Sequence, residues 1–591
     1  MQTIPLLFVH LTDTFKKPAL LHYKKDGAYV SLTTDEVRTE VERIALGLKG
    51  FGVAPGDKVI LLAENGPWWT MTDYAILSLG AITVPVYTSL VPEQIKYIIN
   101  DSDAKVVIVS DRKLWEKAAA KKKDLSKVVH FASFEAEPAQ DVLSFERIKA
   151  RGQEIRASDP RLFETTARAV GPGDTASLIY TSGTTGIPKG VILSHANFAS
   201  NVETLAGIIP FGDQDTDLSF LPLSHVLERL VTFAFMSRGV SMAYAESIEA
   251  VAQNLIEIKP TIMVSVPRLF EKIYARVMDN VLAGSSFKKK IFFWALGVGK
   301  ACGELTLAKK PIPASLERRR RIARKLVFSK ILEKTGGRVR FFVSGGAPLA
   351  RDIAEFFYAL GIVVLEGYGL TESSPVIACN TFDNLRFGTV GKPIPGVDVK
   401  IAPDGEILAR GPNIMKGYYK KEEETREALE GGWLHTGDIG HLDADGFLVI
   451  TDRKKDLIVT SGGKNVAPQP IENTLKQNPY IDNAVVIGGS RKFIAALIVP
   501  NFEKLEEYAK ANGIGYVNRK DLVQNEAVVR FLLQEVDRTT PNLAPYEKVK
   551  KIALLERDFE IEQGEITPTL KVKRNIVEEK YRDLISSLYR D

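Results

Sequence analysis

The chain has 591 residues, which is more than one hydrophobic core usually serves, because single cores stop growing at about 250–300 residues. Its net charge of +5 is small for this length and does not point to nucleic acid as the main partner. Cys302 and Cys379 lie far apart, which argues against a disulfide framework and fits a reducing cytoplasm. No run reaches the ~18 apolar residues of a membrane span, and the N-terminus lacks the basic leader of a signal peptide.

Strand-like and helical patterns alternate over residues 30–110. Residues 34–48 predict a helix with a capping residue and an acidic first turn. Residues 58–63 and 104–110 are apolar and predict buried strands. Alternation of this kind is typical of an α/β fold, in which helices cover parallel sheets.

The next segment is a glycine-rich loop between two strand-like runs. Residues 181–190 read Thr-Ser-Gly-Thr-Thr-Gly-Ile-Pro-Lys-Gly. Glycines let backbone N–H groups approach an anion, hydroxyls add donors, and the lysine supplies a charge, so the loop suits phosphate. It is not a Walker A loop, because Pro188 precedes Lys189 and a strand rather than a helix follows. The alternative is a flexible surface loop with no ligand.

Two segments further along suggest a pocket and a surface. Residues 221–229 read Leu-Pro-Leu-Ser-His-Val-Leu-Glu-Arg, where a lone histidine such as His225 is more often packed in a core than catalytic. From Lys288 to Lys330 the chain has thirteen lysines and arginines against two glutamates, around an aromatic cluster at residues 291–294. Such a basic amphipathic segment can lie on an anionic membrane, and the alternative is a solvated helix pair with its aromatics packed inside.

Residues 338–375 predict two strands, each followed by a glycine-containing turn. The first strand ends at Gly345 and Gly346, where a flat ligand can approach closely. After the second strand, residues 366–375 read Glu-Gly-Tyr-Gly-Leu-Thr-Glu-Ser-Ser-Pro. Here Tyr368 can stack on a purine, Thr371 can bind a phosphate, and Glu372 is a hard carboxylate of the kind that holds Mg²⁺.

The last third of the chain adds three short motifs. Residues 431–438 place Asp438 after a tight turn, and a carboxylate can accept hydrogen bonds from two ribose hydroxyls. Residues 461–468 form a glycine-rich loop, followed by strand-like runs at 484–487 and 495–499 with helical segments, which predict a compact α+β unit. Residues 564–574 read Gly-Glu-Ile-Thr-Pro-Thr-Leu-Lys-Val-Lys-Arg.

Five of these motifs occur in the order of the adenylate-forming enzymes, and the chain resembles their long-chain fatty acid–CoA ligases from about residue 33 to residue 574. The resemblance implies a large N-terminal domain of helix-covered, largely parallel sheets, residues 1–452. It also implies a smaller, mobile α+β C-terminal domain, residues 453–591. The hinge would lie at residues 452–456 with Lys455 as its pivot.

The resemblance also implies roles for individual residues. Those expected to bind ATP are Thr181, Ser182, Gly183, Thr184, Thr185, Lys189, Gly345, Gly346, Ala347, Glu366, Gly367, Tyr368, Gly369, Asp438 and Arg453. Those expected to take part in catalysis are Lys571, Glu372, Thr371 and His225, with Lys573 as the alternative to Lys571. Glu372 and Thr184 would hold the metal, His225 and Phe270 would belong to the acyl pocket, and the CoA side would be formed by Gly462, Gly463 and Lys464.

The implied reaction is activation of a long-chain fatty acid by ATP and Mg²⁺ to acyl-AMP, with release of pyrophosphate and then transfer to CoA. Two alternatives remain open: a fatty acyl-AMP ligase that delivers to a carrier protein, and a catalytically inactive lipid-binding homologue. We expect a cytoplasmic protein that does not bind nucleic acid, with peripheral contact on the inner face of the membrane through the basic segment as a further hypothesis. Members of the family include homodimers, although the sequence shows no self-complementary face.

Overall fold

The structure is a computed structural model of the whole chain. It describes all residues except 121, 126, 136–138, 140, 183–187, 463, 561–562, 568–571 and 591, and it leaves out the side chains of Ser182 and Asn465. No helix in the described part of the chain is both long and apolar enough to cross a membrane.

An eight-stranded sheet contains most of the N-terminal strands, in the order β19-β9-β8-β4-β3-β5-β6-β7. Strands β8, β4, β3, β5, β6 and β7 run parallel, and β9 forms an antiparallel hairpin with β8. The strands are β3 (Lys58–Leu62), β4 (Ile82–Pro85), β5 (Val106–Val109), β6 (His130–Ser133), β7 (Val142–Ser144), β8 (Thr175–Ser182), β9 (Pro188–Ser194) and β19 (Gly417–Tyr418).

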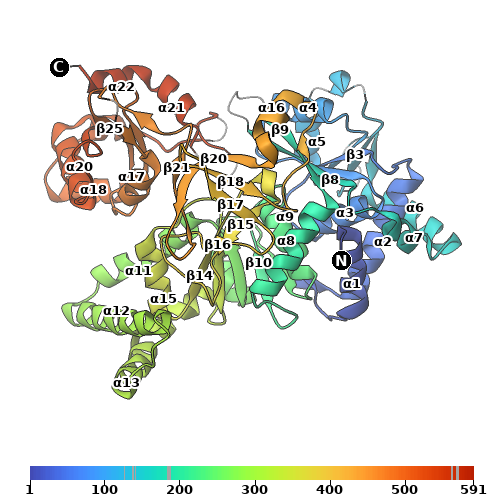
Figure 1. The fold of residues 1–591 in the computed structure, drawn as a ribbon, viewed down its shortest axis with the longest axis horizontal. Coiled ribbons are helices and arrows are strands. Elements are labelled where there is room, and N and C mark those ends of the chain that lie inside the picture. Colours follow the sequence, from blue (N-terminus) through green and yellow to red (C-terminus); the bar gives the residue numbers. More distant parts are fainter. Residues whose placement is uncertain are drawn as a thin grey trace.

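A nine-stranded sheet has the order β16-β15-β14-β13-β12-β10-β11-β1-β2 and is parallel from β14 to β1. Its strands are β1 (Leu21–Lys25), β2 (Ala28–Leu32), β10 (Thr216–Ser219), β11 (Ser241–Tyr244), β12 (Ile262–Ser265), β13 (Phe341–Ser344), β14 (Val363–Gly369), β15 (Val376–Cys379) and β16 (Lys392–Pro393). A four-stranded antiparallel sheet lies beside it (Figure 1) and consists of β17 (Asp398–Ile401), β18 (Glu406–Arg410), β20 (Leu434–Leu442) and β21 (Leu448–Arg453).

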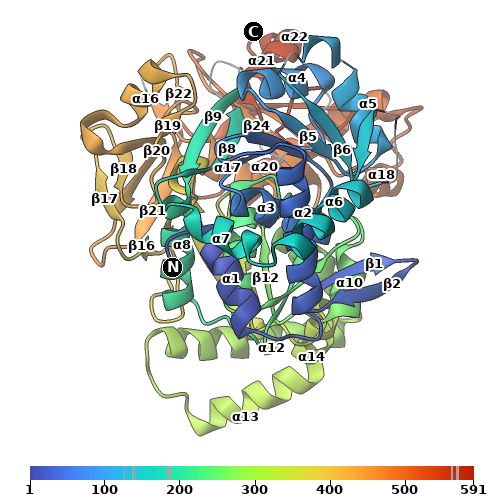
Figure 2. The same cartoon turned by 90° about the vertical axis from the view of Figure 1, so that its right-hand side faces the viewer.

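Helices cover and separate these sheets (Figure 2). The sequence-based prediction of a helix at residues 34–48 is confirmed by α2, which begins after a capping box in which Thr33 and Glu36 bond each other's backbone N–H groups. The helices of this part are α1 (Ile4–Thr14), α2 (Thr34–Gly50), α3 (Pro67–Ser78), α4 (Pro92–Asp101), α5 (Arg112–Ala119), α6 (Phe145–Ser158), α7 (Leu162–Ala169), α8 (His195–Ile208), α9 (Val226–Met236), α10 (Val251–Ile258), α11 (Pro267–Leu282), α12 (Ser286–Leu307), α13 (Ala314–Ala323), α14 (Ser329–Leu332), α15 (Arg351–Leu360) and α16 (Glu422–Ala428).

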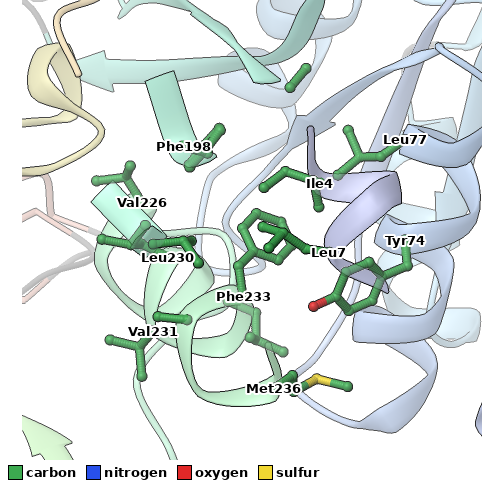
Figure 3. Close-up of a cluster of buried hydrophobic side chains, with 14 of the residues drawn as sticks. Ile4, Leu7, Tyr74, Leu77, Phe198, Val226, Leu230, Val231, Phe233 and Met236 are labelled. Carbon is green, nitrogen blue, oxygen red and sulfur yellow. The ribbon is translucent and has the colours of Figure 1, made fainter. Parts of the chain in front are cut away.

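Helices α3 and α9 pack between the two large sheets, where the largest core lies. Figure 3 shows side chains from α1, α3, α8 and α9 meeting there, with Phe233 of α9 beside Tyr74 of α3. The guanidinium of Arg229 on α9 is fully buried and forms two hydrogen bonds with Asp73 of α3, at 2.7 and 2.6 Å. Its third contact is the hydroxyl of Ser177 on β8, at 2.6 Å, so one cation ties the two helices to the eight-stranded sheet.

The C-terminal part is a three-stranded sheet with helices around it. Within the described part of the chain, the hydrophobic cores of residues 458–589 contain no residue from earlier in the sequence. The elements are β22 (Ile458–Val459), β23 (Asn465–Val466), α17 (Pro468–Leu475), β24 (Ile481–Ile487), β25 (Ile494–Pro500), α18 (Phe502–Ala511), α19 (Arg519–Gln524), α20 (Glu526–Thr539), β26 (Val549–Leu554), α21 (Arg574–Lys580) and α22 (Arg582–Leu588). The α/β fold and the small α+β unit that the sequence predicts are therefore both present.

Candidate active site

A cavity of about 340 Å³ lies where β8, β13, β14, α9 and β20 converge and where the C-terminal part approaches them. One part of its lining is apolar and comes largely from α8, α9 and the segment after α8. The other part is polar or glycine-rich. The apolar residues from this helical wall are Leu205, Ile209, Phe211, Val226, Leu227, Leu230, Val231, Ala234 and Phe235. The polar and glycine residues include Thr181, His225, Ser344, Gly345, Gly346, Gly367, Tyr368, Gly369, Thr371, Glu372, Tyr418, His435, Thr436, Arg453, Thr567 and Lys573.

The β8–β9 hairpin brings Thr181 and Pro188, which flank the undescribed part of the predicted phosphate loop, to this cavity. Thr181 lines the cavity and pairs with Lys189 across the hairpin. The Nζ atom of Lys189 lies 5.2 Å from the ring centroid of Tyr418, whose hydroxyl donates to Oε1 of Glu372 at 2.9 Å. A cation, a phenol and a carboxylate therefore follow one another here, and Tyr418 and Glu372 line the cavity whereas Lys189 does not. Of the loop residues predicted to bind ATP, the side chain of Ser182 and all of Gly183, Thr184 and Thr185 lie outside the described part of the chain.

Strand β14 and the turn after it form the opposite wall. Gly367, Tyr368, Gly369, Thr371 and Glu372 all line the cavity, as the motif predicted for adenine and metal binding requires. Gly369 has a packing reason as well, because a Cβ atom there would overlap the carbonyl oxygen of Pro375.

Ala347 and Glu366, at the borders of these glycine motifs, are not among the residues that line the cavity. Gly345 and Gly346 reach the cavity, whereas the adjoining Ala347 is exposed beside it. Glu366 is buried and accepts a hydrogen bond from the N–H of Leu349 at 3.4 Å. Burial raises the pKa of its carboxyl to about 8, because the loss of water around the ionised form outweighs the hydrogen bond from Leu349.

Tyr368, Asp438 and Arg453 form one connected group. The Tyr368 hydroxyl donates to Oδ2 of Asp438 at 2.7 Å, and Nε of Arg453 lies 3.1 Å from Oδ1 of the same carboxylate. Asp438 and Arg453 face each other across the β20–β21 pair. Burial and the neighbouring carboxylate raise the pKa of Tyr368 well above its usual value. Three residues that the sequence assigned separately to one nucleotide are thus in direct contact.

His225 begins α9 at the cavity wall. Its Nδ1 accepts a hydrogen bond from the N–H of Leu227 at 3.2 Å, so the ring caps the helix. With Nδ1 as acceptor, the neutral ring carries its proton on Nε2. The structure therefore gives His225 a capping role and a place on the cavity lining together.

The acyl-pocket residue Phe270 lies elsewhere. Its side chain is fully buried in a separate core, with ring centroids 5.3 Å from Phe342 and 5.6 Å from Phe357, and it is absent from the cavity lining. The apolar wall comes instead from α8 and α9. Sequence reasoning missed these residues because an apolar helix face looks the same whether it meets a core or a cavity.

Sequence reasoning also missed several polar lining residues, among them Tyr418, His435 and Thr436. His435 and Thr436 belong to the Gly-Gly-Trp-Leu-His-Thr-Gly-Asp stretch that pointed to Asp438, so this motif held the signal. Tyr418 had no such signal in the sequence, because it is only the first of two consecutive tyrosines, and the pairing of β19 with β9 is what brings it to the site.

The C-terminal part contributes Thr567 and Lys573 to the lining. Lys571 lies outside the described residues, and so does Gly463. Gly462 and Lys464 are exposed and away from the cavity.

Lys455 is exposed and forms no ion pair with any described residue, whereas the adjacent Lys454 pairs with Asp404 at 2.7 Å and Glu406 at 3.0 Å. Asp452, at the start of the same segment, is buried. Its Oδ2 accepts a hydrogen bond from the N–H of Gln469 in α17 at 3.3 Å.

The lining fits a magnesium ion held mainly by phosphates. Across the described ranges, no three side chains of the metal-binding types gather in one place. Among the described residues, Glu372 alone presents a carboxylate to the cavity. Since Mg²⁺ at phosphate sites is commonly held by one or two carboxylates plus substrate oxygens, this donor set is sufficient.

Comparisons with known proteins agree with this geometry. Residues 9–419 match the AMP-binding enzyme family, and residues 455–591 match the AMP-binding enzyme C-terminal domain. A long-chain fatty acid–CoA ligase of Mycobacterium bovis is 35% identical over 593 residues, covering 99% of this chain and 96% of that protein. A peroxisomal long chain acyl-CoA synthetase of Arabidopsis thaliana is 33% identical, covering 98% of this chain and 85% of that protein.

Solved structures share the fold at lower identity. The adenylation domain of a carboxylate reductase from Mycobacterium chelonae superposes with a TM-score of 0.74 at 23% identity, covering all of this chain and 91% of that chain. An anthranilate CoA ligase in complex with anthranoyl-AMP gives a TM-score of 0.72 at 21% identity, covering 99% and 98%. Over nearly its whole length, the chain belongs to the AMP-binding, adenylate-forming enzyme family that its motifs resemble.

Proposed function

We propose that this protein is a long-chain fatty acid–CoA ligase that forms acyl-AMP and then acyl-CoA. The observation that carries the proposal is a single cavity whose lining is polar and glycine-rich in one part and helical and apolar in the other. A fatty acid needs both surfaces, one for its chain and one for the carboxylate that reacts with a nucleotide. Full-length relatives named as long-chain fatty acid–CoA ligases support the same substrate class.

The polar part supplies what adenylation requires. A carboxylate is a poor acyl donor, and attack of its oxygen on the α-phosphate of ATP converts it to an acyl-adenylate and releases pyrophosphate. Charge that accumulates on the phosphates must be balanced by fixed donors. Thr181, Thr371 and Glu372 line the part of the cavity where phosphates would lie, and Lys189 pairs with Thr181 across the β8–β9 hairpin.

The nucleoside end would use the connected group of Tyr368, Asp438 and Arg453. The phenol ring offers a face to the base, and the Asp438 carboxylate can accept from ribose hydroxyls. Arg453 fixes that carboxylate from the other side. Mg²⁺ at Glu372, when bound, would neutralise phosphate charge.

His225 would orient the acyl carboxylate. Its Nε2 carries the proton when Nδ1 caps α9, so the ring can donate one hydrogen bond to a carboxylate oxygen. The apolar side chains of α8 and α9 would hold the chain and exclude water from the reacting carbonyl.

The second half-reaction would use a movement of the C-terminal part. We propose a boundary between residues 452 and 453 with Lys455 as pivot, and the separate hydrophobic cores of residues 458–589 support it. Rotation would withdraw the segment that carries Lys571 and Lys573 and would bring the loop with Gly462 and Lys464 to the entry of CoA.

The test is ATP–pyrophosphate exchange over a series of fatty acids, followed by thioester analysis with CoA. Exchange with C12–C18 acids plus acyl-CoA formation supports the proposal. Exchange without thioester indicates delivery to a carrier protein. No exchange by a folded sample that still binds ATP would indicate another carboxylic acid or an inactive homologue.

The same assay separates the two candidate lysines. We expect Lys571→Ala to lower exchange by about 10²-fold or more, on the scale of losing one electrostatic contact to the transition state. Lys573→Ala should lower it less. If Lys573→Ala lowered exchange more than Lys571→Ala, the catalytic role would belong to Lys573, which the structure includes in the cavity lining.

A further inference from the structure

The helical arm is the segment formed by α12, α13 and residues 324–330. Figures 1 and 2 show α12 and α13 extending away from the body of the molecule, with α13 at its outer limit. All residues of the arm are described. Its first helix is fixed firmly to the body, because a Cβ atom at Gly299 would overlap the carbonyl oxygen of Ala359 in α15. The arm is therefore a held projection rather than a loose loop.

Large apolar side chains of the arm face solvent. Phe287 is 72% exposed and Trp294 is 39% exposed, and with Lys290 they occupy positions i, i+3 and i+7 of α12, which share one helix face. Ile322 and Leu326, in and just after α13, are both 48% exposed. A solvated basic helix pair with its aromatics packed inside would not leave these side chains outside.

Most of the positive charge of the arm has no acidic partner among the residues that the structure describes. Among the described residues, only Lys300, Arg320 and Arg321 lie within ion-pair distance of a carboxylate. The basic side chains without an acidic partner are Lys288, Lys289, Lys290, Lys309, Lys310, Arg318, Arg319, Arg324, Lys325 and Lys330. This charge is available to a partner of opposite sign.

We propose that the helical arm docks the protein on an anionic lipid bilayer, with Phe287, Trp294, Ile322 and Leu326 inserted at the interface. Basic residues interleaved with exposed aromatic and aliphatic side chains are what an interfacial segment needs, because the charges attract anionic headgroups and the apolar side chains enter the acyl boundary. A polyanion such as RNA would use the charge but would leave aliphatic side chains such as Ile322 and Leu326 exposed. The choice of a lipid partner also rests in part on the proposed function, whose substrate is a lipid-derived acid.

The test is flotation of the full-length protein with vesicles, without ATP or fatty acid, so that its outcome does not depend on ligase activity. We expect the protein to float with phosphatidylcholine vesicles containing phosphatidylglycerol. Binding to pure phosphatidylcholine should be at least about tenfold weaker, and 0.5 M salt should weaken binding to the anionic vesicles. Binding should also shift the fluorescence emission of Trp294 to the blue, as its ring leaves water.

Two variants separate the charged and apolar contributions. R318Q/R319Q/K325Q should reduce binding to anionic vesicles by about tenfold or more, since each basic residue near the surface contributes. F287S/W294S should keep the salt dependence and still bind at least about fivefold more weakly, because the inserted rings are gone.

Matched controls lie outside the arm. R426Q/R582Q removes two exposed arginines, 77% and 73% accessible, and V517S removes a valine that is 90% exposed. Both should bind vesicles as the unchanged protein does.

Equal binding to neutral and anionic vesicles would overturn the proposal. The proposal would equally be overturned if the control variants lost as much vesicle binding as the arm variants. It would also be overturned if F287S/W294S bound vesicles normally, or if the unchanged protein bound poly(A) but no vesicles, since the arm would then be a polyanion surface. In every variant, ligase activity on a short, water-soluble acid should stay unchanged, which separates failure of docking from failure of the proposed function.

Discussion

The hydroxyl of Tyr368 donates a hydrogen bond to Oδ2 of Asp438 at 2.7 Å, which connects β14 of the nine-stranded sheet to β20 of the antiparallel sheet. The bond sets the tyrosine ring and the carboxylate in place relative to each other before any nucleotide arrives. Preorganisation of this kind lowers the cost of ordering the site on binding.

Tyr368→Phe tests this connection. Loss of the donor leaves the buried Asp438 with Arg453 as its remaining side-chain partner, so we expect the free energy of unfolding to fall by about 1–3 kcal/mol and KM for ATP to rise. Urea unfolding and exchange kinetics measure the two effects. Tyr29→Phe, which removes a hydroxyl bonded to the carbonyl of Tyr244 away from the cavity, is the control for stability alone. An unchanged KM in Tyr368→Phe would contradict the nucleotide assignment.

The chain-length preference should depend on α9. Ala234 is buried and lines the apolar wall, so Ala234→Phe is expected to shorten the longest fatty acid activated, at a cost in stability of about 1–3 kcal/mol. Exchange rates across C8–C18 acids measure the shift. Phe270→Leu serves as the contrast, because Phe270 packs on Phe342 and Phe357 outside the cavity. A change in chain length with Phe270→Leu and none with Ala234→Phe would restore Phe270 to the acyl pocket.

The buried pair of Arg229 and Asp73 should stabilise the fold rather than take part in the reaction. Arg229→Met leaves Asp73 buried without its cation, which we expect to cost about 3–5 kcal/mol in urea unfolding. Arg426→Gln breaks an exposed pair and should cost under about 1 kcal/mol. Similar losses in the two variants would mean that the ion pair between α3 and α9 contributes little.

Glu366 should make stability depend on pH. Its folded pKa of about 8 lies above that of an exposed glutamate, so the folded state keeps a proton that the unfolded state releases. The unmodified protein should therefore lose stability through this group as pH rises from about 4.5 to 8. Glu366→Gln removes the ionisation, so its stability relative to the unmodified protein should increase across that window. Melting temperatures from pH 4.5 to 8.5 measure the difference, and a constant difference would show that Glu366 does not titrate there.

Lys455→Pro tests the hinge. The backbone N–H of Lys455 donates no hydrogen bond to the described residues, so proline removes no donor in this arrangement while it restricts rotation. We expect pyrophosphate exchange to continue and thioester formation to be lost, with Lys455→Ala as the control that keeps a flexible backbone. Equal loss of both half-reactions would argue against a pivot at this position.

Much of the fold followed from local patterns in the sequence. A capping residue and an acidic first turn predicted α2, and apolar runs predicted β3 and β5, because these signals act over a few neighbouring residues. The glycine and threonine motifs likewise pointed to the residues that line the cavity, since close backbone approach needs glycine wherever it occurs in a fold.

Only the tertiary structure decided which side chains meet. Tyr368 and Asp438 are 70 residues apart, and nothing local indicates their hydrogen bond. The roles of Phe270 and Ala234 depended in the same way on packing, because both are buried apolar helix residues and differ only in what lies beside them. Sequence determined the chemistry that the chain carries, whereas burial and contact, which arise from long-range packing, decided where each group can act.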